Sequence, residues 1–370
     1  MFRSSAPMAN SRGICRRRVS HRWISLIVVP ALLAVQAGCG PEPSRPAIFR
    51  LSSLALEGVV LRTVVVDAQG MAWANEHQTA TMYRGAEISG FASVSGPIAL
   101  SGWHMSVTRD LRGHPVFGAY GRGIASPGQL DPLDQWVSWS AEGDCLPDKF
   151  VSMVAVDPDG WIMAGMARAA GLVRLNPAQP ESAECTRWTT ANSPVNLGSG
   201  ENERDGWIGG ITPSVHGERW VGVRDDALWR WRDGGTPDVP EDDQWTPFRP
   251  GDEPGLPSLE FNHLTRDARG RIWIATAGGL ALADGSSIHR VDEVAHPNVE
   301  FVALGPNGYL WVCTSDGISV ISPESLREVD RLNGANGLPG DRVYGIAFSD
   351  DGAWAYVATD SGLALLQRLD

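Results

Sequence analysis

The sequence has few of the side chains from which metal centres and nucleophilic active sites are usually built. Its 370 residues include five cysteines and eight histidines. It contains no Cys-x-x-Cys, no His-Glu-x-x-His, no Gly-x-Ser-x-Gly and no phosphate-binding Gly-Lys-Ser. Asp157-Pro-Asp159-Gly160 and Asp350-Asp-Gly352 begin like calcium loops but lack the distal glutamate that completes such a loop. We therefore interpret both as turns, and expect no metal and no cofactor.

Basic charge is also scarce. Lys149 is the single lysine, and the formal net charge is −12. Residues 1–38 hold six arginines and no acidic residue, which leaves about −18 on the rest of the chain. Nucleic acids and anionic lipid headgroups bind basic surfaces. The composition therefore argues against both as partners of the main body of the protein.

The longest hydrophobic run, residues 23–35, is too short to span a bilayer, which takes about 20 residues. Behind the basic Arg16-Arg-Arg18 it is typical of a signal-peptide core. Gln36-Ala-Gly-Cys39 then resembles a bacterial lipobox, although glutamine stands where leucine is usual. We predict a signal peptide at 1–38, lipidation of Cys39, a tether at 39–47 and anchoring in the outer membrane. The alternative is cleavage after Ala37, which would leave a soluble periplasmic or secreted protein.

What the chain does contain is a short sequence motif that occurs seven times. Its clearest copies include Asp267-Ala-Arg-Gly270-Arg-Ile-Trp273 and Gly305-Pro-Asn-Gly308-Tyr-Leu-Trp311. Each copy of the motif lies between two apolar runs. We therefore expect a β-hairpin with a tight Asp-x-x-Gly turn. The seven turn glycines are Gly70, Gly113, Gly160, Gly217, Gly270, Gly308 and Gly352, and the aromatics that follow them are Trp73, Phe117, Trp161, Trp220, Trp273, Trp311 and Trp354.

The spacing of these glycines, 38 to 57 residues, corresponds to one four-stranded unit per repeat. Repeats of roughly 40 to 50 residues with this strand pattern are typical of propeller blades. The last copy ends three strands into its blade, and Ile48-Phe-Arg-Leu51 stands before Gly70 as the outer strand Val329-Asp-Arg-Leu332 stands before Gly352. We predict an all-β, seven-bladed β-propeller over residues 48–370, with four-stranded blades and the N-terminal strand completing the last blade.

These residues carry a family resemblance. Asn336-Gly-Leu-Pro339 and Pro254-Gly-Leu-Pro257 precede inner strands, and a weaker Gly143-Asp-Cys-Leu-Pro147 occupies the same place in another repeat. Together with the hairpins, they resemble the two-component-regulator propeller repeats, which form the extracytoplasmic sensing region of many hybrid histidine kinases. The resemblance implies a ring that displays a ligand site. The sequence has no kinase or DNA-binding module, so signalling itself is not implied.

The repeat register predicts where such a site would lie. In propellers the inner strands begin at one face of the ring, here called the upper face, and the turns between second and third strands lie there too. Positions eight and seven residues before each turn glycine should therefore line the upper mouth of the central channel, whereas the apolar position six before it should be core. The candidate ligand-binding residues are Arg62, Asn262, His263, Glu300 and Tyr344 from the inner strands, and Glu76, His77, Arg168, Arg224, Asp316 and Asp360 from the upper turns.

Two functional classes fit this pattern. The first is a monomeric, non-catalytic binding module that takes a glycan, peptide or protein on its upper face. The second is a propeller enzyme, a lyase or metal-assisted hydrolase resembling the streptogramin lyases or lactonases. An enzyme of this kind needs a histidine near a carboxylate, or several metal ligands, at the channel. The pairs His263 with Glu300 and His77 with Glu76 are the candidates. Because histidine is scarce, the sequence favours binding.

Cys145 and Cys185 could form a disulfide in an oxidising compartment. Their places in the repeat argue against it, because Cys145 enters a blade from an upper loop whereas Cys185 starts an outer strand from the lower face. We therefore expect both to stay unpaired.

Overall fold

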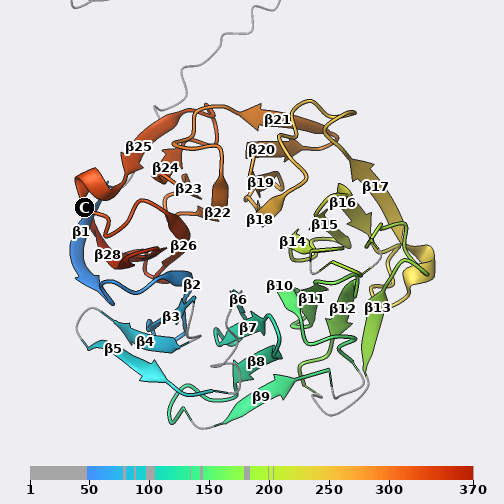
Figure 1. The fold of residues 1–370 in the computed structure, drawn as a ribbon, viewed down its shortest axis with the longest axis horizontal. Helices are drawn as coiled ribbons and strands as arrows, with labels where there is room; N and C mark the ends of the chain where they lie inside the picture. The colour runs from blue at the N-terminus through green and yellow to red at the C-terminus, as the bar shows by residue number, and fades with distance from the viewer. Residues whose placement is uncertain are drawn as a thin grey trace, which may run out of the picture. The chain divides into compact units, whose positions relative to one another are not determined.

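Seven four-stranded antiparallel sheets make up the fold, and each sheet is one blade of a ring (Figure 1). The computed structural model describes residues 48–77, 81–86, 89–96, 105–133, 135–141, 145–178, 184–198, 200–202 and 204–369. The predicted signal peptide, Cys39 and the tether lie outside these residues. Within the described part of the chain, no helix combines the length and apolar character needed to cross a membrane. The prediction of a seven-bladed, all-β propeller is confirmed.

The strands follow one another outward through each blade. Blades 1 to 3 are β2 (Leu61–Val66), β3 (Ala72–Glu76), β4 (Met82–Ala86) and β5 (Gly90–Val94); β6 (Met105–Arg109), β7 (Pro115–Ala119), β8 (Gly123–Pro127) and β9 (Trp136–Trp139); and β10 (Val151–Val156), β11 (Ile162–Met166), β12 (Leu172–Leu175) and β13 (Cys185–Trp188).

The next three blades have the same order. They are β14 (Ile208–Ile211), β15 (Glu218–Val223), β16 (Ala227–Arg232) and β17 (Gln244–Phe248); β18 (Phe261–Arg266), β19 (Ile272–Thr276), β20 (Gly279–Asp284) and β21 (Ser287–Val291); and β22 (Val299–Leu304), β23 (Leu310–Thr314), β24 (Gly317–Ile321) and β25 (Glu328–Leu332). Two short 3-10 helices, η1 (Pro240–Asp242) and η2 (Gly334–Asn336), lie in loops.

The hairpin turns form as the Asp-x-x-Gly motif predicts. The buried carboxylate of Asp67 accepts hydrogen bonds from the backbone N–H groups of Gln69 and Met71, at 2.9 and 3.0 Å, and Gly70 takes a positive φ of 76°. The other oxygen of Asp67 accepts a hydrogen bond from the indole of Trp73 at 2.8 Å. In this hairpin the aspartate therefore links the turn to the aromatic residue that follows it.

The core consists of hydrophobic clusters that lie between neighbouring blades, seven of them among the described residues. Trp73, Trp220, Trp273 and Trp311 occupy one register and are all buried, with at most 2% of their surface exposed. Trp161 and Trp354 are only half-buried. In those two blades the core positions are filled by Met163 and Tyr356 instead.

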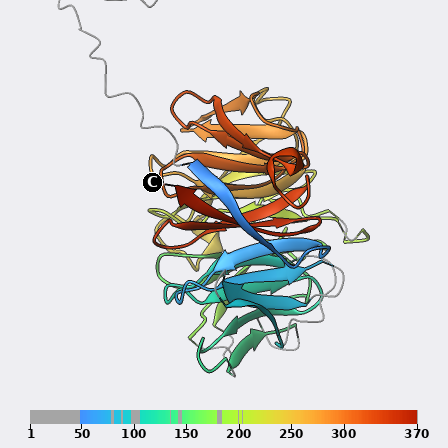
Figure 2. The same cartoon turned by 90° about the vertical axis from the view of Figure 1, so that its left-hand side faces the viewer.

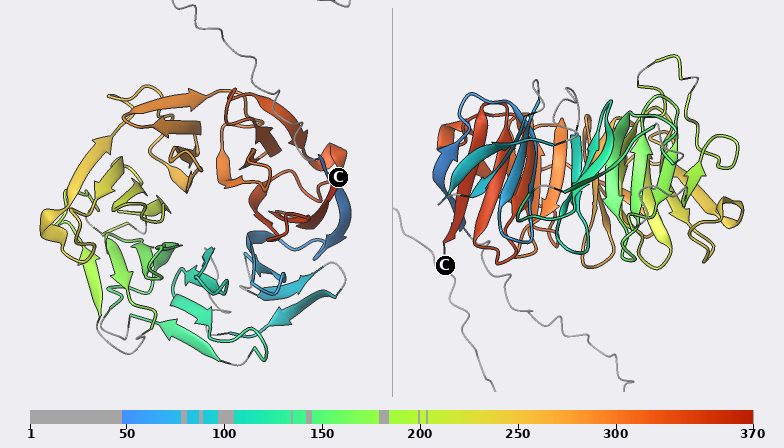
Figure 3. Two further views of the ribbon diagram at one scale, coloured as in Figure 1. Left: turned by 180° about the vertical axis from the view of Figure 1, so that it is seen from behind. Right: turned by 90° about the horizontal axis from the view of Figure 1, so that it is seen from below.

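The ring closes through blade 7, which combines the two ends of the described chain. β26 (Val343–Phe348), β27 (Trp354–Thr359) and β28 (Gly362–Leu369) are completed by β1 (Ile48–Ala55), which pairs antiparallel with β28. Figure 2 and the rear view in Figure 3 show the blue first strand lying against the red last blade. The prediction that the N-terminal strand completes the last blade is confirmed.

The prediction for the cysteines is wrong, because a disulfide joins Cys145 to Cys185, with their Cα atoms 5.7 Å apart. β13 has only four residues, so its lower end lies about 10 Å from its upper end. The segment that enters blade 3 packs along this strand, and Arg187 donates a hydrogen bond to the Cys145 carbonyl at 2.9 Å. A short strand thus brings an upper loop within reach of a cysteine at its lower end.

Replacing Trp273 with alanine should lower the free energy of unfolding by about 3–5 kcal/mol, the usual cost of removing a fully buried large aromatic. Trp273 is 0% exposed and packs between blades 5 and 6. The half-buried Trp354 provides the matched control, and Trp354→Ala should cost less. Denaturant unfolding of both variants tests this. A cost below about 1 kcal/mol for Trp273→Ala, the range of ordinary surface changes, would contradict the assigned packing.

Closure through β1 can be tested at Phe49. This side chain is 4% exposed and contacts Trp311 and Phe348 edge-on, with ring centroids 5.3 and 5.8 Å apart. Phe49→Ala should therefore destabilise the whole ring by about 3–5 kcal/mol, whereas Arg50→Ala, at an exposed neighbour on the same strand, should change stability by less than about 0.5 kcal/mol. Equal stability of the two variants would show that β1 does not hold the ring closed.

Candidate functional site

The inner strands carry a common irregularity at their upper ends. In six of them, β2, β10, β14, β18, β22 and β26, the pairing with the second strand shifts by one residue. A bulge of this kind frees one residue from the ladder and re-aims its side chain. The residues skipped by the shift are Arg62, Ser152, Gly209, Asn262, Glu300 and Tyr344. Each is the residue eight positions before a turn glycine.

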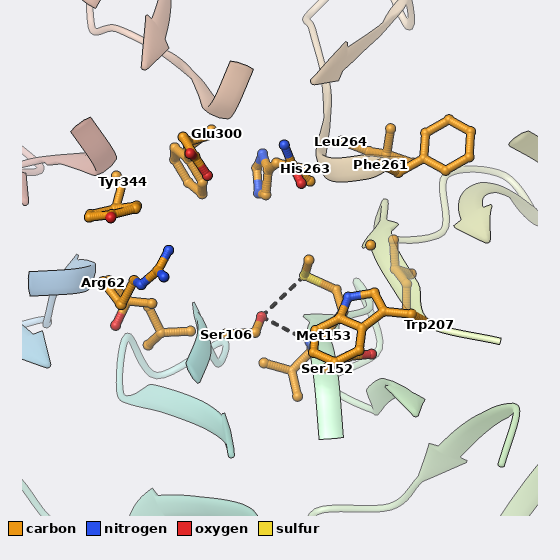
Figure 4. Close-up of a pocket in the computed structure, with 18 of the residues that line it drawn as sticks. Arg62, Ser106, Ser152, Met153, Trp207, Phe261, His263, Leu264, Glu300 and Tyr344 are labelled. Atoms are coloured by element: carbon orange, nitrogen blue, oxygen red, sulfur yellow. Dashed lines mark hydrogen bonds between the residues drawn. The ribbon is translucent and has the colours of Figure 1, made fainter. Parts of the chain in front are cut away.

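The bulges border a cavity of about 620 Å³ at the centre of the ring. Because a bulge lets two successive residues face the same side, both members of several predicted pairs line it, including Asn262 with His263 and Glu300 with Phe301. The position six before the glycine is buried in every blade except blade 2, where Val107 is half-buried. The sequence-predicted residues that line the cavity are Arg62, Arg224, Asn262, His263, Glu300 and Tyr344. Figure 4 shows four of them, Arg62, His263, Glu300 and Tyr344.

Two arginines contact the ring of Tyr344 on one side of the cavity. The guanidinium carbons of Arg62 and Arg342 lie 4.1 and 5.1 Å from the centre of its ring. Glu300 accepts hydrogen bonds from Arg342 Nε and Asn298 Nδ2, both at 2.8 Å. Burial would lower the pKa of Arg342, but the Glu300 carboxylate outweighs that effect and raises it. Arg342 and Glu300 therefore form an ion pair at the rim that favours the charged form of the arginine.

A second ion pair lies at the boundary of blades 4 and 5. Arg224 contacts Glu260 at 2.5 Å, and burial lowers the pKa of Arg224, an effect that Glu260 opposes. Arg204 also lines the cavity and is exposed. The charged side chains of the cavity wall are thus Arg62, Arg204, Arg224, Arg342, Glu260 and Glu300. The wall has more positive than negative charge, whereas the protein as a whole is acidic.

His263 is held in the wall as a neutral imidazole. Its ring stacks on Phe301 with centroids 3.9 Å apart. Burial lowers the pKa of His263 from 6.5 to about 4, because the charged imidazolium is disfavoured there, and a backbone contact with Val302 offsets this only in part. No hydrogen bond joins His263 to Glu300 among the described residues. His263 can therefore pack against a ligand or hydrogen-bond with it, but it carries no charge at neutral pH.

Aromatic residues line the opposite side of the mouth. The rings of Tyr120 and Trp207 stack with centroids 5.6 Å apart, and Phe150 lies 4.5 Å from Tyr120. All three side chains are half-buried. Figure 4 shows Trp207 across the channel from Arg62 and Tyr344. The mouth thus has a charged side and an aromatic side.

Five of the sequence-predicted residues do not line the cavity: Glu76, His77, Arg168, Asp316 and Asp360. His77 lies just behind the wall, with Nε2 3.5 Å from Arg62, and Glu76 accepts a hydrogen bond from Tyr83 at 3.3 Å. Arg168 stacks on Phe150 at 4.7 Å, and Asp316 is exposed on an upper turn. Of the six candidates predicted from the upper turns, only Arg224 lines the cavity, so the predicted second row of residues is largely outside the site. Among the described residues, no group of three or more acidic, histidine or cysteine side chains is placed to hold a metal ion.

Several residues of the mouth were missed, and most of them share one register. Trp207, Glu260, Asn298 and Arg342 line the cavity, and each stands ten residues before a turn glycine. Phe150 occupies the same position in blade 3. The residue between this position and the bulge is buried in every such blade. Counting back ten as well as eight and seven would have identified this upper row.

Comparison with known proteins supports the repeat. Residues 255–278 match the family model described as the two-component regulator propeller. The matched segment contains Gly255-Leu-Pro257 and the hairpin around Gly270. Comparison of the sequence with curated proteins finds no significant match.

Solved structures share the fold at low identity. One is the extracellular domain of a protein assigned as a hybrid two-component system from B. thetaiotaomicron, with a TM-score of 0.65, 18% identity and coverage of 88% of this chain and 41% of that one. Another is PorZ, a surface component of the type-IX secretion system of Porphyromonas gingivalis, with a TM-score of 0.60, 15% identity and coverage of 82% and 46%. This chain thus spans less than half of either protein.

Virginiamycin B lyase from Staphylococcus aureus is similar over nearly its whole length, with a TM-score of 0.61, 13% identity and coverage of 87% of this chain and 99% of the lyase. At these identities the likeness establishes the fold alone. The family model and the fold agree that the chain carries a two-component-regulator propeller repeat within a seven-bladed ring, as its sequence predicted.

Proposed function

We propose that the protein is an exported, lipid-anchored binding module that takes a polar ligand, a glycan, peptide or protein segment, at the upper mouth of its channel. The observation that carries the proposal is the row of bulges. Five of the six bulged inner strands present a side chain, rather than a glycine, at the bulge. The cavity of about 620 Å³ that they border has the size of a small-ligand site.

Export rests on the N-terminal sequence and on analogy. The basic segment, the apolar run and Gln36-Ala-Gly-Cys39 support a lipoprotein signal. Two similar structures are described as an extracellular domain and a bacterial surface component. Ile48 pairs with Leu369, so the described chain begins at the lower end of blade 7. A tether of residues 39–47 reaches at most about 30 Å, which would keep the lower face near the membrane and direct the mouth away from it.

The arrangement of the cavity favours binding over catalysis. The enzyme alternative requires an acid–base histidine beside a carboxylate. The pKa of His263 is lowered to about 4, and Glu300 is paired with Arg342 rather than with the histidine. His77 and Glu76 lie outside the cavity lining. The candidate acid–base pairs are thus held in other interactions, whereas the bulge residues remain suited to contact a ligand.

Filling the channel should abolish binding without unfolding the ring. Gly345 lines the cavity, and the nearest atom to an added Cβ, Val64 Cγ1, would lie 3.9 Å away. We expect Gly345→Leu to remove the binding of ligands found by screening oligosaccharides and peptides against the wild type, because its side chain would occupy the mouth. The matched control is Gly251→Leu, at an exposed loop where an added Cβ meets nothing within 4 Å. Ligands that bind both variants as tightly as the wild type would contradict binding in the channel.

Lipid anchoring can be tested separately at Cys39. In a Gram-negative host the wild-type protein should partition with membranes, and Cys39→Ser should release it to the soluble extracytoplasmic fraction, because no acyl chain can then be attached. Stable anchoring needs more than one lipid signal, since a single acyl chain binds membranes only marginally. Fractionation with antibody detection gives the result. Equal solubility of the two proteins would favour cleavage after Ala37.

A further inference from the structure

Arg62 is a charged residue of the cavity wall for which the described residues provide no carboxylate partner. It forms no ion pair with another described residue, because Glu300, the acidic residue of its side of the mouth, bonds to Arg342. Its guanidinium lies over Tyr344 and 3.5 Å from His77, and its Nε is buried without a hydrogen-bond partner. Burial lowers the pKa of Arg62, and Tyr344 and Glu300 offset part of that effect. A bound anion would supply the missing partner.

The charged side chains of the cavity wall, taken together, also carry an excess of positive charge. Glu300 is matched by Arg342 and Glu260 by Arg224, so Arg62 and Arg204 are left as the positive charges of the lining that no described carboxylate matches. His263 adds none at neutral pH, because its pKa is about 4. The protein itself has a formal net charge of −12. Excess positive charge in the channel of an acidic protein is therefore a local feature, and it attracts anions into a concave site.

The opposite wall suits a flat, weakly polar surface. Trp207 stacks on Tyr120, and Figure 4 shows its indole facing the channel across from Arg62. Between them lie the Ser106 hydroxyl and the Met153 thioether, but Ser106 Oγ already donates to Met153 Sδ and accepts from Val154 N, both at 3.1 Å. The middle of the channel thus offers packing rather than free hydrogen bonds.

We propose that the ligand is an organic carboxylate on a six-membered ring, with the carboxylate held by the Arg62 guanidinium and a face of the ring packed against Trp207. This inference rests on the proposed binding function and specifies its ligand chemistry. An arginine fork pairs well with a carboxylate, and a hydrogen bond to a charged group contributes more than a neutral one. The ring could be a sugar acid or an aromatic acid, because both present a flat face.

The experiment uses two pairs of probes that differ only in charge: D-glucuronate against D-glucose, and benzoate against benzamide. Binding to the full chain is measured by ligand-observed NMR and titration. We expect the charged member of at least one pair to bind about tenfold or more tightly than the neutral member. Which pair shows the preference distinguishes a sugar acid from an aromatic acid. Inorganic sulfate should compete with the charged probe but not with the neutral one.

Arg62→Gln should remove the charged-over-neutral preference, whereas Arg122→Gln, at an exposed upper turn outside the cavity lining, should retain it. Sulfate competition on the wild type tests the same point if the Arg62 variant does not fold. Absence of any preference, whether both members bind alike or neither binds, would overturn the inference. The proposed function would fail separately, if filling the channel by Gly345→Leu left ligand binding unchanged.

Discussion

Closure of the ring by β1 is the constraint on which the channel depends. Each blade buries its apolar face only against its neighbours, so the seven clusters are complete only when blade 7 meets blades 6 and 1. Phe49 lies in the cluster between blades 6 and 7, where it contacts Trp311. The strand that closes the last blade therefore also packs on the blade before it. Because the mouth is formed by inner strands from all around the ring, its geometry follows from this closure.

Within a blade, a buried aspartate can hold the hairpin turn and the tryptophan that follows it in place. Asp267, like Asp67, accepts two backbone N–H groups and the indole N–H of its tryptophan, here at 3.3 Å. Blade 6 has Gly305 at this position, and the indole nitrogen of Trp311 is buried without a hydrogen-bond partner. A buried polar group left unpaired is costly. The register of the tryptophan is nevertheless unchanged, so packing between blades, rather than the hydrogen bond, determines where the aromatic lies.

Most of the fold was predictable because it repeats. The division into blades, the hairpins and the completion of blade 7 by the strand that begins at Ile48 all follow from one repeated sequence motif. The structure confirms all three. The site was predictable only in part. The positions of Arg62 and Tyr344 follow from the register, and Trp207 and Arg342 also share one register, ten residues before a turn glycine. That this second position faces the channel follows from the bulge, which the sequence pattern alone does not reveal. The Cys145–Cys185 disulfide was missed for a related reason, since the path of a loop along a short strand is set by tertiary packing.

The repeat also explains how one scaffold can hold an asymmetric site. The position six before each turn glycine is apolar and almost uniformly buried, and so is the position nine before it in blade 1 and in blades 3 to 7, so these positions maintain the ring. Every blade contributes residues from positions ten, eight or seven to the cavity lining, and these residues differ from blade to blade. Here blades 6, 7 and 1 contribute Glu300, Tyr344 and Arg62, whereas blades 2 and 4 contribute Tyr120 and Trp207. Because these side chains project from a closed ring rather than from a free loop, their separation is fixed before any ligand arrives. A ligand with one polar end and one flat face would therefore enter such a mouth in a single orientation.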